Sequence, residues 1–302
     1  MSIAVSGLVK NYGQQVAVNQ VSFSINKGEV VGFLGPNGAG KSTTFKMITG
    51  YLHPDGGQVS VCGKPVWPDT RDAKSRIGYL PESNPLYTDM YVREYLQFSG
   101  NIHRVRGLAA RIEQVIDLVG LRPEANKKIA QLSKGYKQRT GLAAALIHDP
   151  EVLILDEPTT GLDPNQIAGI RSVIRELGRE KTVLFSSHIM QEVEAVCSRV
   201  IIINKGNIVA DDELARLQEK NRGESGVLVE FNRPPDATLL SGMVHAIGVQ
   251  PVSETRFRIS TENAPALRQE ILQLATAHSL DIVSLQQAGQ SLEGIFRELT
   301  GQ

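Results

Sequence analysis

The sequence predicts an α/β protein: a parallel sheet covered by helices on both faces, with a β-rich N-terminal part, a helical insertion and a small α+β unit at the C-terminal end. Three observations predict this fold. Short, uniformly apolar segments alternate with helical patterns, which is typical of parallel strands buried on both faces. Helical spacing fills residues 91–149. After a polar, glycine-containing stretch at 219–226, apolar segments resume in a β-α-β-β-α-β order.

The composition indicates an ordinary globular protein. Hydrophobic residues make up 41% and charged residues 21%, and 32 basic residues balance 32 acidic ones. The net charge therefore favours neither a nucleic acid nor an anionic membrane as a partner. Cys62 and Cys197 lie far apart without metal-ligand spacing, which predicts reduced thiols in the cytosol.

No membrane-spanning or secretory segment is predicted. No apolar run reaches about 18 residues, and the first residues lack the basic and long apolar regions of a signal peptide. We therefore expect a cytoplasmic protein that reaches a membrane only through a partner.

The first part of the chain is predicted to be rich in strands. Alternating or uniformly apolar residues predict strands, in chain order, over 3–9, 16–25, 30–34, 58–62 and 77–80. A helix is predicted to begin at Ser42. Turn residues at 11–13, 53–57 and 63–65 separate these elements.

A helical block interrupts the α/β core. Apolar residues at three- and four-residue spacing predict helices over 91–99, 109–119 and 137–147. We place this block at about 88–149, ending at His148-Asp149-Pro150, as an insertion into the core. Apolar strands return at 152–155, 182–185 and 200–203.

We expect two domains, residues 1–220 and 221–302. The second is predicted to consist of a strand at 227–231, a helix at about 236–247, strands at 249–252 and 256–259, a helix at 264–277, a strand at 281–286 and a last helix at 291–299. This order predicts a ferredoxin-like unit. No catalytic constellation is evident in it.

A phosphate-binding loop is the strongest signal for function. Residues 35–43, Gly-Pro-Asn-Gly-Ala-Gly-Lys-Ser-Thr, fit the pattern G-x-x-x-x-G-K-[ST] between a strand and a helix. Glycines let backbone N–H groups surround phosphate oxygens, and the helix start adds unpaired N–H groups. Lys41 would reach the β- and γ-phosphates, and the Ser42 hydroxyl would ligate Mg²⁺. A chance glycine-rich turn is disfavoured by this context, so we predict a nucleotide site made of Gly35, Pro36, Asn37, Gly38, Ala39, Gly40, Lys41, Ser42 and Thr43.

Two adjacent carboxylates follow the apolar strand at 152–155. Because the C-terminal ends of parallel strands share one edge of a sheet, Asp156 is expected beside the phosphate loop, where it would hold Mg²⁺ or its water shell. Glu157 would orient a water molecule and take its proton. His188 also follows a strand and could bind a γ-phosphate. An acidic pair often only starts a loop and a lone histidine is more often structural, but the phosphate loop favours the catalytic interpretation.

A second anion-binding surface is predicted before the helix at 137–147. Ser133 is expected to cap this helix, and Gly135 would leave N–H groups accessible at its positive end. Helix caps are common, so the pattern alone does not establish a site.

Together, these motifs resemble the ATP-binding subunits of ABC transporters over about residues 2–215. Residues 35–43 resemble the Walker A loop, residues 153–157 the Walker B strand and residues 132–138 the signature sequence. Residues 161–164 resemble the D-loop. His188 matches the switch histidine, and Tyr12 falls where the family stacks an aromatic ring on adenine.

Within the family, residues 79–90 and 291–297 are most similar to the gliding-motility-associated ATPase subunit and, more broadly, to subunits of ABC-2-type exporters. Glu82 replaces the usual loop glutamine; an acid there could still bind Mg²⁺ or water. Lys134 and Tyr136 replace a glycine and a glutamine of the signature, whereas Ser133 and Gly135 remain.

The resemblance implies ATP and Mg²⁺ as ligands and a head-to-tail dimer, formed with itself or with a related ATPase subunit. Each site would use five residues of one chain and two of the other: Lys41, Ser42, Asp156, Glu157 and His188 from the first, and Ser133 and Gly135 from the second. The expected partners are integral-membrane permease subunits, which would dock near residues 82–91 and hold the chain on the cytoplasmic face of the inner membrane.

Two other classes of function remain open. One is a soluble mechanical ATPase that acts on ribosomes or nucleic acid; the chain lacks a second ATPase domain and a long coiled-coil insertion, and its neutral charge favours no nucleic-acid partner. The other is a regulatory binding module in which ATP is structural, which the Asp156-Glu157 pair disfavours. The sequence does not identify the transported substrate.

Overall fold

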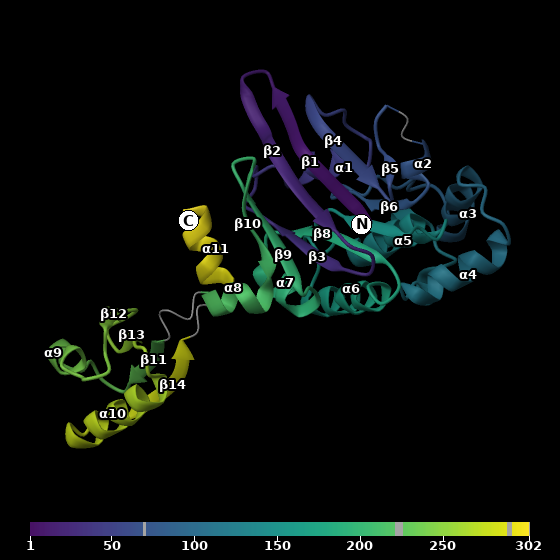
Figure 1. The fold of residues 1–302 in the computed structure, drawn as a ribbon. Coiled ribbons are helices and arrows are strands. Elements are labelled where there is room, and N and C mark those ends of the chain that lie inside the picture. Colours follow the sequence, from purple (N-terminus) through teal and green to yellow (C-terminus); the bar gives the residue numbers. More distant parts are fainter. Residues whose placement is uncertain (69–70, 221–225, 289–291, 302) are drawn as a thin grey trace. The chain divides into compact units, whose positions relative to one another are not determined.

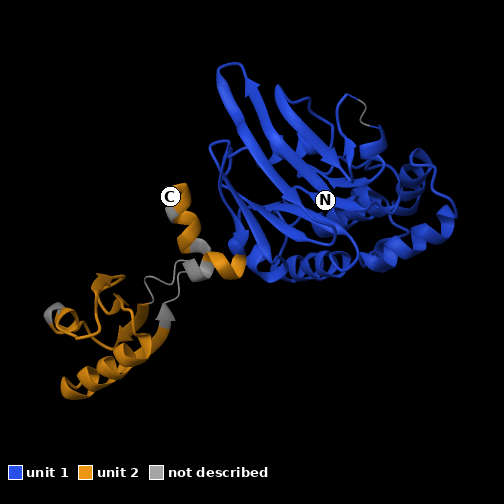
Figure 2. Cartoon of the chain, viewed as in Figure 1, with its two compact units in different colours: residues 1–213 blue, residues 214–302 orange. Residues whose placement is uncertain are grey.

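The protein divides into two compact units, residues 1–213 and 214–302 (Figure 2). The computed structural model describes residues 1–68, 71–220, 226–288 and 292–301. The division between the units falls before the expected boundary at residue 220, and residues 221–225 of the polar segment expected there lie outside the described residues.

An antiparallel sheet forms the N-terminal part of unit 1 (Figure 1). Its strand order is β2-β1-β4-β5, with β1 at Ile3–Tyr12, β2 at Gln15–Ile25, β4 at Gly56–Val61 and β5 at Lys64–Pro65. The predicted β-rich start is confirmed. Strand β5 was not predicted, because two residues are too few to show a pattern.

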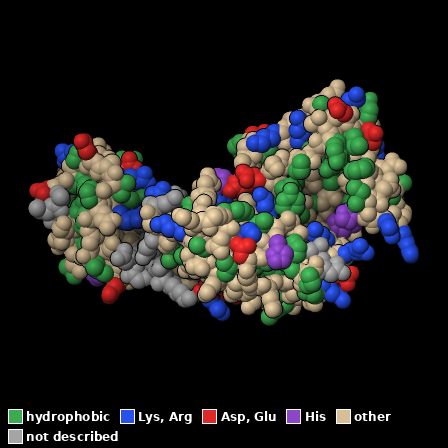
Figure 3. Space-filling view, turned by 90° about the horizontal axis from the view of Figure 1, so that it is seen from above, with side chains coloured by type: hydrophobic (Ala, Val, Ile, Leu, Met, Phe, Trp, Pro, Cys, Tyr) green, Lys and Arg blue, Asp and Glu red, His purple; other side chains and the backbone are tan. Residues whose placement is uncertain are grey.

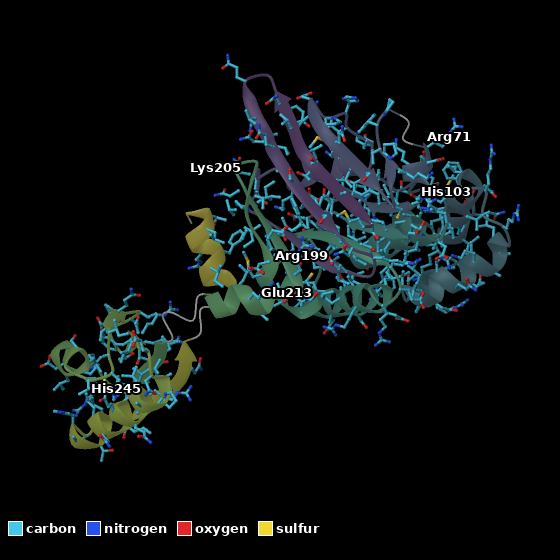
Figure 4. All side chains as sticks on the ribbon, viewed as in Figure 1. Arg71, His103, Arg199, Lys205, Glu213 and His245 are labelled. Atoms are coloured by element: carbon cyan, nitrogen blue, oxygen red, sulfur yellow. The ribbon has the colours of Figure 1, made fainter. Side chains whose placement is uncertain are left out.

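A six-stranded sheet carries the rest of unit 1, in the order β10-β9-β3-β8-β7-β6. The strands are β3 (Val30–Leu34), β6 (Ile77–Leu80), β7 (Val152–Leu155), β8 (Thr182–Ser187), β9 (Arg199–Asn204) and β10 (Asn207–Glu213). The predicted parallel sheet is confirmed for β3 and β6–β9, whereas β10 pairs antiparallel with β9. Arg199, labelled in Figure 4, binds both Glu29 and Asp211 and thereby ties β10 to the sheet.

The core lies on both faces of β3. On one face Phe33 packs against Phe23 of β2 and Phe45 of α1 (Lys41–Ile48), with ring centroids 5.7 and 5.5 Å apart. On the other face Gly32 lies under α7 (Met190–Val196), where an added Cβ would be 2.5 Å from Val193. Helix α6 (Pro164–Leu177) packs on α7. The phosphate-loop strand is thus held rigidly between two packed layers.

The helical block joins two neighbouring strands of the sheet, as predicted. It contains α3 (Val92–Ile102), α4 (Leu108–Leu118) and α5 (Lys134–Leu146), and it runs between β6 and β7, which pair in parallel. A short α2 (Arg71–Lys74) precedes β6, and 3₁₀ turns at Arg122–Glu124 and Ile129–Gln131 precede α5. Helix α5 lies so close to β6 that a Cβ on Gly78 would be 2.3 Å from the Ala145 carbonyl oxygen. Among the described residues, none of the helices is long and apolar enough to cross a membrane.

Unit 2 has the predicted β-α-β-β-α-β order. It consists of α8 (Leu214–Lys220), β11 (Gly226–Phe231), α9 (Ala237–Ser241), β12 (Gly248–Pro251), β13 (Arg256–Ser260), α10 (Ala264–Ala277), β14 (Ile282–Ala288) and α11 (Leu292–Thr300). The sheet is antiparallel with the order β12-β13-β11-β14. Ser291, where the last helix was predicted to begin, lies outside the described residues.

One element of unit 2 is shorter than predicted. The helix predicted at about 236–247 ends at Ser241. The residue after it is Gly242, which has a low helix propensity. The N–H of His245 then donates to the Glu270 carboxylate at 3.1 Å instead of to a helical carbonyl, so the chain leaves the helical path.

Candidate functional site

The phosphate loop joins the end of β3 to the start of α1, and its two fixed glycines have no room for a side chain. A Cβ on Gly35 would lie 2.5 Å from the Ile203 carbonyl oxygen. Gly40 has a φ of 108°, and a Cβ there would lie 2.5 Å from the Ala17 carbonyl oxygen. Within the described chain, the N–H groups of Gly40 and Lys41 have no protein acceptor. The loop therefore presents free donors to an anion.

A cavity of about 640 Å³ opens in front of this loop. It brings together most of the predicted nucleotide-site residues, namely Tyr12, Asn37, Gly38, Gly40, Lys41, Ser42, Thr43, Glu82, Glu157 and His188. Its wall also contains Gln15, Ala17 and Thr160, which the sequence did not single out. Tyr12 is 50% exposed, so its ring is available to a planar ligand. An aromatic ring, a cation, free N–H donors and hydroxyls in one cavity fit a nucleotide with its phosphates.

Lys41 is 5% exposed and is held by the protein itself. Its Nζ donates to the carbonyl oxygens of Gly35 at 2.7 Å and Pro36 at 3.2 Å. The same ammonium lies 3.4 Å from Glu157 Oε1. The cation is therefore positioned between the loop and the carboxylate that was predicted to act on water.

Glu157 lies at the centre of a set of polar contacts. Its Oε2 accepts a hydrogen bond from Thr160 Oγ1 at 2.8 Å and lies 3.1 Å from His188 Nδ1. Burial acts to raise the pKa of Glu157, but the hydrogen bond from Thr160 and the charges of Lys41 and His188 outweigh it, so the pKa lies below its usual value. The carboxylate is therefore ionised at neutral pH.

The backbone of Glu157 is strained. Its φ is 48°, in the left-handed region that costs a residue with a side chain about 1 kcal/mol or more. This conformation turns the carboxylate into the cavity while the preceding Asp156 stays buried behind it.

Ser186 links the carboxylate of Asp156 to the backbone of Glu157. Its hydroxyl donates to Asp156 Oδ1 at 2.7 Å and accepts a hydrogen bond from the Glu157 N–H at 2.8 Å. Asp156 is 1% exposed and does not line the cavity, whereas Ser42 and Glu82, the other residues predicted to bind metal, do. Among the described residues, no cluster of three or more His, Cys, Asp or Glu side chains is arranged to hold a metal ion.

Ser133 and Gly135 lie outside this cavity. Ser133 caps α5 as predicted, accepting a hydrogen bond from the Tyr136 N–H at 3.4 Å. A Cβ on Gly135 would lie 2.6 Å from the Gln166 side chain. Neither residue lines the nucleotide cavity of its own chain.

A second cavity, of about 370 Å³, lies between β6, the segment at 81–85 and helices α3 and α5. We call it the groove. Its lining is mostly apolar and aromatic and includes Tyr79, Tyr95 and Ile102. Hydrophobic side chains also gather on the face of unit 1 seen in Figure 3. At one end of the groove the ring of His103, labelled in Figure 4, stacks on His148 with centroids 3.9 Å apart.

The chain is similar to curated ATP-binding proteins along nearly all of its length. It is 36% identical over 300 residues to the linearmycin resistance ATP-binding protein LnrL of Bacillus subtilis (strain 168), which covers 97% of this chain and 96% of that protein. It is 40% identical over 233 residues to the Nod factor export ATP-binding protein I of Burkholderia lata, which covers 76% of each chain.

Solved structures show the same fold. The structure of an ATP-binding subunit of an ABC transporter has a TM-score of 0.66 and 28% identity, and the match covers 73% of this chain and 93% of that one. A dimeric structure of a bacterial ABC transporter cassette has a TM-score of 0.65 and 25% identity, covering 70% and 98% of the two chains. The ABC transporter family model itself matches residues 18–160. The chain therefore belongs to the ABC transporter family, as an ATP-binding subunit with ATPase activity.

Proposed function

We propose that this chain energises an exporter-type ABC transporter and works as a dimer that closes on ATP and opens after hydrolysis. Two relatives support the exporter class, because their names specify linearmycin resistance and Nod factor export. The dimeric cassette supports pairing, here with a second copy or a related ATPase subunit. A link to gliding motility stays a prediction of the sequence resemblance.

The observation that carries the catalytic part is the contact of Glu157 with both Lys41 and His188 inside the nucleotide cavity. Lys41 and His188 would bind the phosphates, and Glu157 would orient the attacking water. The charge of Lys41 helps to keep the pKa of Glu157 low. Phosphate oxygens that engage Lys41 weaken this effect, so the carboxylate becomes a better proton acceptor when substrate is bound.

Ser42, Asp156 and Glu82 are the residues that would hold Mg²⁺ or its water shell. The ion, when bound, neutralises charge on the transferred phosphoryl group. Ser186 holds Asp156 at the edge of the sheet through its 2.7 Å hydrogen bond. Glu82 places a further carboxylate in the cavity wall. The usual residue of the family at this position is a glutamine, whose side chain ends in an amide.

The surface at Ser133 and Gly135 would complete the site of the second chain. It lies at the N-terminus of α5, outside the nucleotide cavity of its own chain. ATP would therefore be bound by two surfaces at once and would stabilise the closed pair by its higher affinity for that state. Hydrolysis would remove the bridging charge and allow the pair to open.

The groove is the proposed contact with integral-membrane permease subunits. It is apolar and lies between the sheet and the helical block, beside the segment at 81–85 that follows β6. Docking there would hold the chain on the cytoplasmic face of the inner membrane.

The catalytic assignment is tested with Glu157→Gln and, as a matched control, Glu180→Gln on the exposed surface. We expect Glu157→Gln to bind ATP, to lose about 100-fold or more of turnover and to accumulate as a dimer in ATP. The control should keep wild-type turnover. Turnover of Glu157→Gln within a few-fold of wild type would refute its role.

The transport assignment is tested by affinity purification from gently solubilised cells. A multi-span membrane protein in stoichiometric yield is the expected result. Recovery of only soluble proteins, ribosomes or nucleic acid would overturn the transport assignment and leave the ATPase chemistry in place.

A further inference from the structure

Asn84 lies across the side of α5. Its Nδ2 donates to the Lys137 carbonyl oxygen at 2.8 Å and lies 3.4 Å from Gln138 Oε1. A carbonyl oxygen has two lone pairs, so Lys137 can accept this bond in addition to its helical one. The side chain of Asn84 is therefore attached to the second turn of the helix that Ser133 caps.

The site on α5 is shaped for this amide. A Cβ on Gly141 would lie 2.2 Å from Asn84 Oδ1, so only a glycine allows the amide to lie flat against the helix. Asn84 itself has a φ of 40°, a conformation that asparagine tolerates better than most residues. The contact between Asn84 and α5 therefore depends on the positive φ of Asn84 and on the absence of a side chain at Gly141.

A tight turn connects this contact to the nucleotide cavity. The N–H of Asn84 donates to the Pro81 carbonyl oxygen at 3.1 Å, which closes the turn at 81–84. Glu82, inside the turn, lines the nucleotide cavity, whereas Asn84 and Gly141 line the groove. A displacement of Glu82 therefore moves the Asn84 amide with it, because the turn between them is short and hydrogen-bonded.

We propose that Asn84 is a positioning residue that couples nucleotide at Glu82 to the orientation of α5, and so to ATP-driven pairing of two chains. The inference rests on the proposed function, in which the N-terminus of α5 binds the nucleotide of the second chain. The hydrogen bond from Asn84 transmits movement because it joins the turn at 81–84 to the backbone of α5 at Lys137. Lys137 lies four residues after Ser133. Asn84 does not touch the nucleotide cavity and acts only through α5.

The test uses the full chain with Glu157→Gln as the parent, so that hydrolysis does not reopen the pair. Asn84→Asp keeps the shape of the side chain but places an acceptor against the Lys137 carbonyl. Asn84→Gly removes the amide and still permits a positive φ. Gly141→Ala displaces the amide without altering Asn84. Asn126→Gly is the control, because its amide bonds to Arg93 elsewhere in the helical block.

Two quantities are measured for each variant: ATP affinity of the dilute monomer, and the dimer dissociation constant in saturating ATP by analytical ultracentrifugation. We expect monomer affinity to stay within about twofold, because Asn84 does not line the nucleotide cavity. The bond is already present in the single chain, so its loss weakens pairing only by letting α5 leave the orientation that pairs. We expect the dimer dissociation constant to rise about tenfold in the Asn84 and Gly141 variants, as it would if about a tenth of the pairs of chains had both helices in that orientation. The control should match the parent.

A merely structural role would change both quantities together, and that outcome would also overturn the inference. If the parent forms a dimer in ATP and the Asn84 and Gly141 variants have the same dimer dissociation constant as the parent, this inference is overturned. The proposed function would then remain intact. Absence of an ATP-dependent dimer of the parent itself would refute the proposed function and the inference with it.

Discussion

Replacing Ser186 with alanine should destabilise unit 1 although it removes only one oxygen atom. The hydroxyl is fully buried and holds both acids of the candidate site, accepting from the Glu157 N–H and donating to Asp156. Its loss leaves a buried N–H without an acceptor, which costs about 1–3 kcal/mol, and removes a hydrogen bond to a charged group, worth about 1.5–3 kcal/mol. We therefore expect a loss of about 3 kcal/mol.

The measurement is denaturant or thermal unfolding of the full chain followed by tryptophan fluorescence. Trp67 is the only tryptophan in the sequence and packs against the core of unit 1, so its signal reports on that unit. For a unit of this size, about 3 kcal/mol corresponds to a fall in melting temperature of about 6–12 °C.

The matched control is Ser75→Ala. Its hydroxyl donates to the Asp72 carbonyl oxygen at 2.9 Å on the exposed surface. Exposed substitutions of this kind stay within about 0.5 kcal/mol. A Ser186→Ala chain within about 1 kcal/mol of wild type would refute the reasoning, because it would mean that water or a rearranged donor satisfies both groups.

Two further predictions concern the phosphate loop and pH. Gly40→Ala should weaken ATP binding at least about tenfold in a titration, because its Cβ would lie 2.5 Å from the Ala17 carbonyl oxygen. The control, Gly28→Ala, is also at positive φ but has open space around it, so it should bind ATP normally. Equal ATP binding by the two variants would contradict the steric argument. Burial and the neighbouring His103 lower the pKa of His148 to about 4. The unfolded chain then binds the proton more tightly, so stability is complete above about pH 6.5 and decreases as the pH falls towards 4, by about 1–2 kcal/mol after allowance for partial exposure. His148→Gln should remove this part of the pH dependence, and parallel unfolding profiles of the two chains between pH 7 and 4.5 would contradict it.

Strands buried on both faces were the easiest elements to predict. The apolar runs at 77–80 and 152–155 coincide with β6 and β7. Strand β7 lies inside the covered sheet and is buried at every position, and β6, although it is an edge strand, is buried at three of its four positions. Strand β10 was missed. It is an edge strand whose burial alternates between exposed and half-buried, and its last residues are acidic, so its sequence resembles a loop.

Motif spacing placed most of the candidate site. The phosphate loop, Glu157 and His188 meet in one cavity because their strands end at the same edge of the sheet. The contacts that hold Glu157 were not predictable, since Thr160 and Ser186 are ordinary hydroxyl residues that belong to no motif. The same is true of Asn84, whose role depends on a glycine more than fifty residues later that happens to lie beneath it.

The strand order also determines when the phosphate loop can form during synthesis. Among the described strands, β3 at residues 30–34 pairs with β8 and β9 alone, and these begin at residues 182 and 199. At about 5–20 residues per second, the ribosome needs roughly 8–30 s after making β3 to make the first of these neighbours. During that time the apolar strand has no partner from its own chain, so it is exposed to aggregation and available to chaperones. The nucleotide site, although encoded near the start of the chain, must be among the last parts of unit 1 to fold.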